Sequence, residues 1–329
     1  MRRSTWPGAL AIFSLVACGG GATPPPRPPP PPGPPPPALA GRWTVRAPMP
    51  AARTENSAAA LNDLVYVAGG FAVGAGPAPE LFVYDPATDR WETLLDVPRP
   101  VNHAGLAGLE GRVYVVGGFR ENTFQAIDAL QIFDPASGTF RQGPPLPTPR
   151  GALAVTVLVG RIHAIGGLDA QGRDVGAHEV FDPATESWSS LAPMPTARDH
   201  HGVAAVGGLI YAAAGRAANV NLSVLEVYDP ATDSWSPGVP VPTARSGVAA
   251  AVLAGKVYVF GGESLTGGGT FDAAERFDPA TGEWERLTPM PTARHGLGAA
   301  TVGGAIYVVG GGPDAGLFFS AVNERFTPE

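Results

Sequence analysis

A short apolar segment that ends on two glycines recurs along this chain at a nearly constant interval. Residues 64–68 read Leu-Val-Tyr-Val-Ala and stop at a glycine pair. The pairs are Gly69-Gly70, Gly117-Gly118, Gly166-Gly167, Gly261-Gly262 and Gly310-Gly311, with a degenerate copy at Ala214-Gly215. Successive copies are 48, 49, 48, 47 and 49 residues apart. A fixed period of this length indicates six structural repeats.

Each repeat carries further landmarks in fixed register, within four segments that resemble strands. An Asp-Pro turn follows the third segment, and six residues after its Asp stands an aromatic residue: Trp91, Phe140, Trp188, Trp235 or Trp284. An arginine stands sixteen residues before the first glycine in five of the six repeats: Arg53, Arg150, Arg198, Arg245 and Arg294. The second repeat has Val101 at that position.

This combination of glycine pair, Tyr-Asp-Pro and spaced Trp resembles the kelch motif over the whole of residues 41–329. The resemblance implies a β-propeller built from four-stranded antiparallel blades. A lone sheet of this kind leaves one face uncovered, whereas blades arranged around an axis bury that face against each other. We therefore predict an all-β fold, a six-bladed kelch-type β-propeller.

The two ends of the repeat region complement each other. The last repeat stops at Phe326-Thr327-Pro328-Glu329 and lacks its fourth segment, while Trp43 precedes Pro50 by the seven residues found in the other repeats. We predict that the strand at Trp43 pairs in the last blade. Closing the ring in this way removes the exposed strand edges that invite aggregation.

The first forty residues have a different composition. A basic start, Met1-Arg2-Arg3, precedes an apolar stretch too short to span a bilayer, as in a signal peptide. The stretch ends in Leu15-Val16-Ala17-Cys18, which resembles the bacterial lipobox and implies acylation of Cys18, the only cysteine. The alternative is an ordinary signal peptide with an incidental cysteine. We predict a lipoprotein signal peptide at 1–17, an acylated, Gly/Pro-rich linker at 18–40, and the propeller at 41–329.

This organisation predicts a lipid-anchored protein of the cell envelope. Gly19 after the cysteine favours the outer over the inner membrane. The proline tract at 24–37 favours a stiff polyproline II spacer. Removal of the signal peptide takes away Arg2 and Arg3 and changes the net charge from −7 to −9. This negative charge argues against nucleic acid as a partner and against anionic lipid as a partner of the propeller, so the lipid anchor is the predicted membrane contact.

Strand order within a blade predicts which face carries function. Loops between the second and third strands, and between blades, emerge together on one face, and they vary in length and sequence. Function on rigid scaffolds concentrates in such loops. The variable loops are residues 71–79, 120–127, 169–176, 217–223, 263–271 and 313–318.

Two groups of polar residues are candidates for this binding face. The five repeated arginines could form a cationic ring for a carboxylate or an acidic sugar. Alternatively they form a structural ion-pair belt with Gln131, Glu179, Glu226, Glu275 and Glu324, which share one register. The second group is His103, His200, His201 and His295, with Asp199 positioned to make a carboxylate–imidazole pair for acid–base work. Polar residues that merely line the pore are the alternative, and we assign no catalytic residue, metal or cofactor.

We predict a binding or scaffolding module that recognises a protein or a glycan through the variable loops. The alternative is a sugar mutarotase similar to N-acetylneuraminate epimerase, since that enzyme is also a six-bladed, exported kelch protein. Galactose oxidase has a similar propeller, but its copper-radical chemistry needs a tyrosine cross-linked to a cysteine. Residues 41–329 contain no cysteine, so that activity is excluded.

The lipoprotein hypothesis predicts that Cys18→Ser releases the protein from membranes into the soluble envelope fraction, because the acyl chains are its only membrane contact. Cell fractionation with immunodetection measures this. A wild-type chain that is already soluble, or a variant that stays bound, would contradict the hypothesis.

Overall fold

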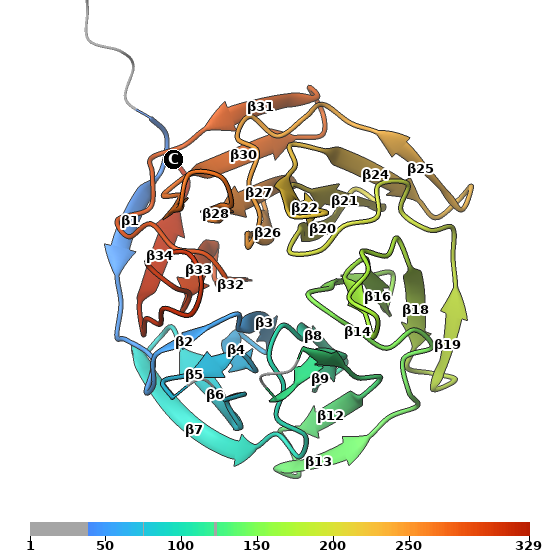
Figure 1. Ribbon diagram of the computed structural model, residues 1–329. Helices are drawn as coiled ribbons and strands as arrows, with labels where there is room; N and C mark the ends of the chain where they lie inside the picture. The colour runs from blue at the N-terminus through green and yellow to red at the C-terminus, as the bar shows by residue number, and fades with distance from the viewer. Residues whose placement is uncertain (1–38, 75, 122–123) are drawn as a thin grey trace, which may run out of the picture. The chain divides into compact units, whose positions relative to one another are not determined.

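The computed structural model describes residues 39–329 apart from 75, 122 and 123, so the predicted acylation at Cys18 lies outside the described residues. Within them the chain forms six four-stranded antiparallel sheets arranged as blades around a central axis (Figure 1). This confirms the predicted six-bladed β-propeller. Among the described residues there is no helix with the length and apolar character needed to cross a membrane.

Every blade runs from a strand at the axis to a strand at the rim. The inner strands are β3 (Ser57–Leu61), β8 (Gly105–Leu109), β15 (Ala154–Leu158), β20 (Gly202–Val206), β26 (Ala249–Leu253) and β32 (Gly298–Val302). The second strands are β4 (Leu64–Ala68), β9 (Arg112–Val116), β16 (Arg161–Ile165), β21 (Leu209–Ala213), β27 (Lys256–Phe260) and β33 (Ala305–Val309). The third strands are β6 (Glu80–Asp85), β12 (Leu130–Asp134), β18 (His178–Asp182), β24 (Leu225–Asp229), β30 (Ala274–Asp278) and β34 (Asn323–Thr327). The outer strands are β7 (Arg90–Asp96), β13 (Thr139–Gln142), β19 (Ser187–Ser190), β25 (Ser234–Pro237), β31 (Glu283–Arg286) and β1 (Arg42–Val45).

Short two-stranded sheets shape the loops of five blades within the described residues. They are β2 (Arg53–Thr54) with β5 (Phe71–Ala72), β10 (Phe119–Arg120) with β11 (Gln125–Ala126), β14 (Arg150–Gly151) with β17 (Leu168–Asp169), β22 (Arg216–Ala217) with β23 (Val220–Asn221), and β28 (Glu263–Ser264) with β29 (Gly269–Thr270). These pairings hold the variable loops above the same face of the ring.

The N-terminal strand closes the ring as predicted. Strand β1 pairs antiparallel with β34, with Trp43 opposite Phe326 and Val45 opposite Glu324. The Trp43 ring lies 5.0 Å from the Phe326 ring and 5.5 Å from the Phe260 ring of the neighbouring blade. The sixth blade is therefore built from both ends of the repeat region, which lie side by side in Figure 1.

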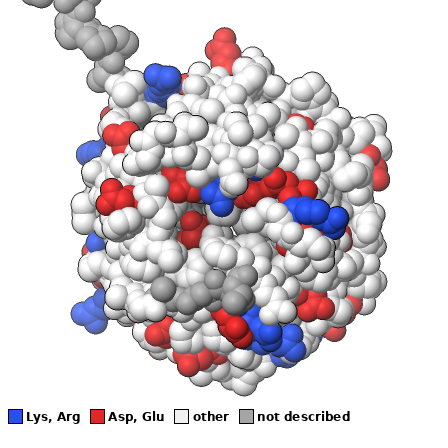
Figure 2. All heavy atoms as spheres, in the orientation of Figure 1, with Lys and Arg blue, Asp and Glu red and all other residues white. Residues whose placement is uncertain are grey.

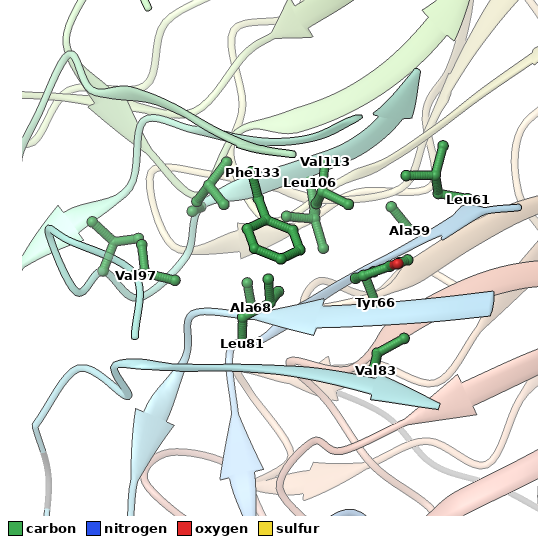
Figure 3. Packing of buried hydrophobic residues seen from close by; sticks show 13 residues of the cluster. Ala59, Leu61, Tyr66, Ala68, Leu81, Val83, Val97, Leu106, Val113 and Phe133 are labelled. Carbon is green, nitrogen blue, oxygen red and sulfur yellow. The ribbon is translucent and has the colours of Figure 1, made fainter. Parts of the chain in front are cut away.

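Six large apolar clusters in the described part of the chain each span two neighbouring blades. Between blades one and two, Tyr66 and Leu81 face Val113 and Phe133 (Figure 3). The Tyr66 and Phe133 rings are 6.5 Å apart. Because apolar burial is shared between blades, each blade depends on its neighbours for most of its hydrophobic stabilisation.

The glycine pairs make close contacts between backbones. The atoms nearest to a Cβ added at these glycines do not belong to the outer-strand Trp. At Gly117 (φ 60°) an added Cβ would lie 2.5 Å from the Arg150 carbonyl oxygen, and at Gly118 (φ 104°) 2.8 Å from the Asn102 carbonyl oxygen. Both the left-handed backbone and the lack of space therefore require glycine.

The outer-strand tryptophans instead connect the rims of neighbouring blades. Their rings are half-buried, and the indole N–H donates to a backbone carbonyl of the preceding blade. The acceptors for Trp43, Trp91, Trp188, Trp235 and Trp284 are the carbonyls of Thr288, Ala47, Pro144, Ala192 and Val239, at 2.8–3.0 Å. The repeated Trp thus fixes the spacing of blades at the outside of the ring.

Ring closure predicts strong amide protection in β1. The amides of Thr44 and Arg46 should exchange with solvent as slowly as those of Glu285 and Leu287, which hold equivalent positions in blade five. Arg46 N–H donates to the Asn323 carbonyl as Leu287 N–H does to the Ala274 carbonyl, each at 2.9 Å. Native-state hydrogen exchange with residue resolution measures this. Exchange at Thr44 close to the unfolded rate would rule out closure by β1.

Candidate functional site

The five repeated arginines are buried inside the blades. Each has 0% of its surface exposed, so the hypothesis of a cationic ring at the pore mouth is wrong. Four of them pair with the glutamate predicted as the structural alternative: Arg150 with Glu179, Arg198 with Glu226, Arg245 with Glu275 and Arg294 with Glu324. The guanidiniums also donate to backbone carbonyls, as Arg245 does to Gly261 at 2.7 Å. These ion pairs belong to the scaffold.

The first two blades depart from this pattern. In blade one Phe82 occupies the glutamate register, and Arg53 instead lies 4.0 Å above the Phe82 ring and pairs with Glu80 at 2.8 Å. In blade two both members are neutral. Gln131 takes the place of the glutamate and forms hydrogen bonds of 2.8 and 3.0 Å with the backbone N–H and C=O of Arg99.

A closed ring of backbone hydrogen bonds surrounds the axis on the loop face. In blades two to six the residue two positions after the arginine register donates its N–H to the carbonyl at the same register of the preceding blade. In blade one the next residue, Asn56, donates instead and closes the ring onto the Gly296 carbonyl at 3.3 Å. We call the six residues at this register the axial ring: Glu55, His103, Ala152, His200, Gly247 and Gly296. All six have φ between 51° and 66°, the left-handed region.

The axial ring brings a carboxylate and imidazoles from different blades together. Glu55 Oε2 lies 3.3 Å from His103 Nε2 and 3.8 Å from His200 Nε2. Glu55 Oε1 lies 3.5 Å from His295 Nε2, and this nitrogen is also 3.5 Å from Glu263 Oε2. Glu55 lies so close to Gly296 that a Cβ there would approach its Oε1 to 2.6 Å.

Neighbouring side chains orient two of the imidazoles. Asn102 donates its amide N–H to the Glu121 carbonyl at 3.2 Å, so its Oδ1 is free to accept from His103 Nδ1 at 2.7 Å. His200 Nδ1 donates to Asp199 Oδ1, which confirms that these two residues form a carboxylate–imidazole pair. In both rings Nε2 therefore carries the lone pair and faces Glu55.

Arg216 forms ion pairs with two carboxylates of this cluster. Its guanidinium contacts Asp199 Oδ1 at 2.8 Å and Glu263 Oε1 at 3.0 Å, and its Nη2 lies 3.3 Å from His200 Nε2. Since an arginine can only donate, His200 Nε2 accepts, in agreement with the tautomer above.

Burial and charge set the ionisation of the cluster. Burial by itself would raise the pKa of Glu55, but the three imidazoles and Arg216 that face the carboxylate outweigh burial and lower its pKa. Burial lowers the pKa of His103, only partly opposed by Glu55. At neutral pH the site therefore presents an ionised carboxylate beside the uncharged His103 imidazole.

A cavity of about 120 Å³ lies along the axis and is bounded by the axial ring and by the first residues of the inner strands. Its wall is made of small residues such as Gly105, Gly202 and Gly298. In Figure 2 acidic and basic side chains gather around the central hollow of this face. The polar cluster thus stands at the mouth of an axial channel.

The structure separates the predicted histidines. His103, His200 and His295 converge at the axis, whereas His201 is buried between blades three and four, where its Cε1 would lie 2.5 Å from a Cβ at Gly166. Sequence reasoning missed Glu55, Arg216 and Glu263. Glu55 had an available signal, because it occupies the same register as His103 and His200.

The comparisons with known proteins agree with this fold. Residues 142–311 match the family model described as KLHDC2/KLHL20/DRC7 Kelch-repeats domain, and residues 52–94 and 100–147 match the Kelch motif. The chain is 33% identical to mouse Kelch-like protein 35 over 81 residues, which are 25% of this chain and 13% of that protein. It is 31% identical to Beta-scruin of Limulus polyphemus over 77 residues, 23% of this chain and 8% of that protein. It is 35% identical to Kelch-like protein terF of Aspergillus terreus over 86 residues, 24% and 19% of the two chains. The matched segments thus span less than a fifth of these relatives.

The ion-pair belt predicts a large cost for breaking one pair. Arg150→Val leaves the Glu179 carboxylate buried without its partner and should lower the free energy of unfolding by about 3–5 kcal/mol. Denaturant unfolding measures this. Adding Glu179→Gln gives blade three the same uncharged residues, valine and glutamine, that blade two has at these two registers. The double variant should therefore recover a large part of the lost free energy of unfolding. A double variant less stable than Arg150→Val would contradict the proposed cause.

Proposed function

Because this chain belongs to the Kelch-repeat family, we propose that it is a binding module that holds a protein partner on its loop face. The observation that carries the proposal is the distribution of exposed apolar side chains. Of ten large apolar side chains exposed among the described residues, five lie in the variable loops: Val73, Phe124, Val220, Leu317 and Phe318.

These five side chains come from four different blades, and all lie in the variable loops of one face. Val73 is 75% exposed, Val220 58% and Phe318 50%. Large apolar side chains gathered on one face of a soluble domain are typical of protein-interaction surfaces. The buried arginine belt and the rim tryptophans hold the blades rigid, so the loops are presented with little freedom to rearrange.

The anchoring segment complements this proposal. An acylated Cys18 would fix the chain to the cell envelope, and the proline tract would hold the propeller away from the lipid surface. In this arrangement the module recruits its partner to a membrane. The outer membrane is favoured over the inner by Gly19.

The second candidate is a mutarotase-type enzyme acting on a sugar. The Asp199–His200 pair next to Arg216 favours it, because an oriented imidazole beside an arginine can transfer protons while an anionic group is held. NMR measurement of anomer exchange over a panel of sugars, sialic acid included, separates the two candidates. Catalysed exchange that is lost in His200→Gln would favour the enzyme.

The binding proposal predicts face-specific capture. A photo-crosslinking amino acid placed at Val220 or Phe318 should capture a discrete partner in the native envelope. The same group at Val159, which is 84% exposed on the turn between β15 and β16 at the opposite face, should not. Mass spectrometry identifies the captured chain.

Serine substitutions at the same positions measure how much these side chains contribute to the affinity for the captured partner. Val220→Ser with Phe318→Ser should weaken its binding at least tenfold, while Val159→Ser leaves it unchanged. All three side chains are exposed, so stability should change by no more than about 0.5 kcal/mol per substitution. Equal capture from both faces would contradict a loop-face interface.

A further inference from the structure

We propose that Glu55, His103 and His200 bind one divalent transition-metal ion at the mouth of the axial channel. One ligand atom from each of the three residues lies within 4.8 Å of the other two. The ligand atoms that we propose are Glu55 Oε2 and the Nε2 atoms of the two histidines. Two ligands at usual bond lengths on one tetrahedral ion are about 3.3–3.5 Å apart. The Glu55–His103 pair has this spacing at 3.3 Å, and the Glu55–His200 pair is slightly longer at 3.8 Å.

The outer contacts are those of a metal site. Metal-binding histidines donate their second N–H to a carboxylate or carbonyl, which fixes the tautomer and raises ligand basicity. His103 Nδ1 is held by Asn102 and His200 Nδ1 by Asp199, so Nε2 carries the lone pair in each ring and faces the Glu55 oxygen. The Nε2 of His200 also accepts from Arg216 at 3.3 Å. A carboxylate oxygen and an imidazole lone pair repel at these distances unless a cation lies between them.

The charges of the site leave room for a dication. Among the described residues in contact with the imidazoles or with Arg216, three carboxylates, Glu55, Asp199 and Glu263, face a single guanidinium. An imidazole is uncharged when it binds a metal, so in the metal-bound site the three carboxylates exceed the single guanidinium by two charges. A divalent ion supplies them, and Arg216 can give up His200 while it keeps both Asp199 and Glu263.

Backbone strain falls on the same three residues and on Ala152. In the axial ring every member has φ > 0, and blades five and six meet this requirement with Gly247 and Gly296. A residue with a side chain costs roughly 1–2 kcal/mol in this conformation. The chain nevertheless places a side chain there in four blades, and three of these residues, Glu55, His103 and His200, are the ligands. Strain of this kind concentrates at functional sites.

The donor set also limits the ion. Two imidazole nitrogens and one carboxylate oxygen suit Zn²⁺, Fe²⁺, Co²⁺ or Ni²⁺ rather than Ca²⁺ or Mg²⁺. His295 contacts the other oxygen of Glu55 and would orient that carboxylate. Three protein ligands leave coordination positions open to water or to a ligand in the channel.

Zn²⁺ titration of the untagged, chelator-treated chain by calorimetry tests the proposal. Wild type should bind one equivalent at the axial site. The double variant His103→Gly with His200→Gly should lose at least about 100-fold in affinity. Glycine is chosen because blades five and six already hold it in this register, so the variant relieves strain. Ala152→Gly, at the same register of blade three, is the matched control and should bind as wild type does.

Three further readouts separate metal binding from folding. Thermal unfolding should show that the double variant remains folded, and Co²⁺ loaded into wild type should give visible bands of nitrogen and oxygen ligation. Imidazole ¹⁵N NMR of the wild-type chain should shift His103 and His200 Nε2 on adding Zn²⁺, with no variant needed. Absence of a stoichiometric site in wild type, unchanged affinity in the double variant, or unshifted Nε2 signals would each overturn the proposal.

Discussion

The ring depends on a repeated junction between each glycine pair and two arginine registers. The first glycine's carbonyl accepts from the arginine of its own blade, as Gly166 does from Arg150 at 2.9 Å. The second glycine's N–H donates to the arginine carbonyl of the next blade, as Gly167 does to Arg198 at 2.9 Å. One short motif thus satisfies a buried guanidinium and joins two blades. The junction explains why glycine and arginine recur together at a spacing of sixteen residues.

Features that recur in every repeat could be predicted from the sequence, because one interpretation has to satisfy six copies. The blade number, the strand order and closure at Trp43 all follow from register. The role of single residues inside the repeat was harder to predict. The arginines were placed on the correct face, but burial decides between a ligand site and a scaffold, and a repeat pattern carries no information about burial. The Arg150–Glu179 pair is therefore visible in the sequence only as one of two alternatives.

The candidate site was only partly predictable for a different reason. His103, His200 and His295 were identified as a group, but their distances depend on how tightly the axial ring closes. Glu55 stands alone as a residue type in this region and is visible in the sequence only through its register. When the position two residues after the arginine is compared across blades, it contains Glu, His, Ala, His, Gly and Gly. A position that is glycine in some blades and ionisable in others marks left-handed backbone that carries a functional side chain.

Residues that recur in every blade build the scaffold, and residues that differ between blades build the candidate site. Hydrogen bonds between neighbouring blades fix the axial backbone, five of them at one register and the sixth from Asn56, so any side chain placed on the ring points into one small volume. Changing one residue in one blade then alters the chemistry of the mouth without disturbing the blade contacts, which rest on the glycine pairs, the arginines and the rim tryptophans. The variable loops add an outer circle of apolar residues around the same axis. A partner seated on Val220 and Phe318 would therefore cover the polar cluster, and the occupancy of the central site and the binding of the partner would be linked through their shared position.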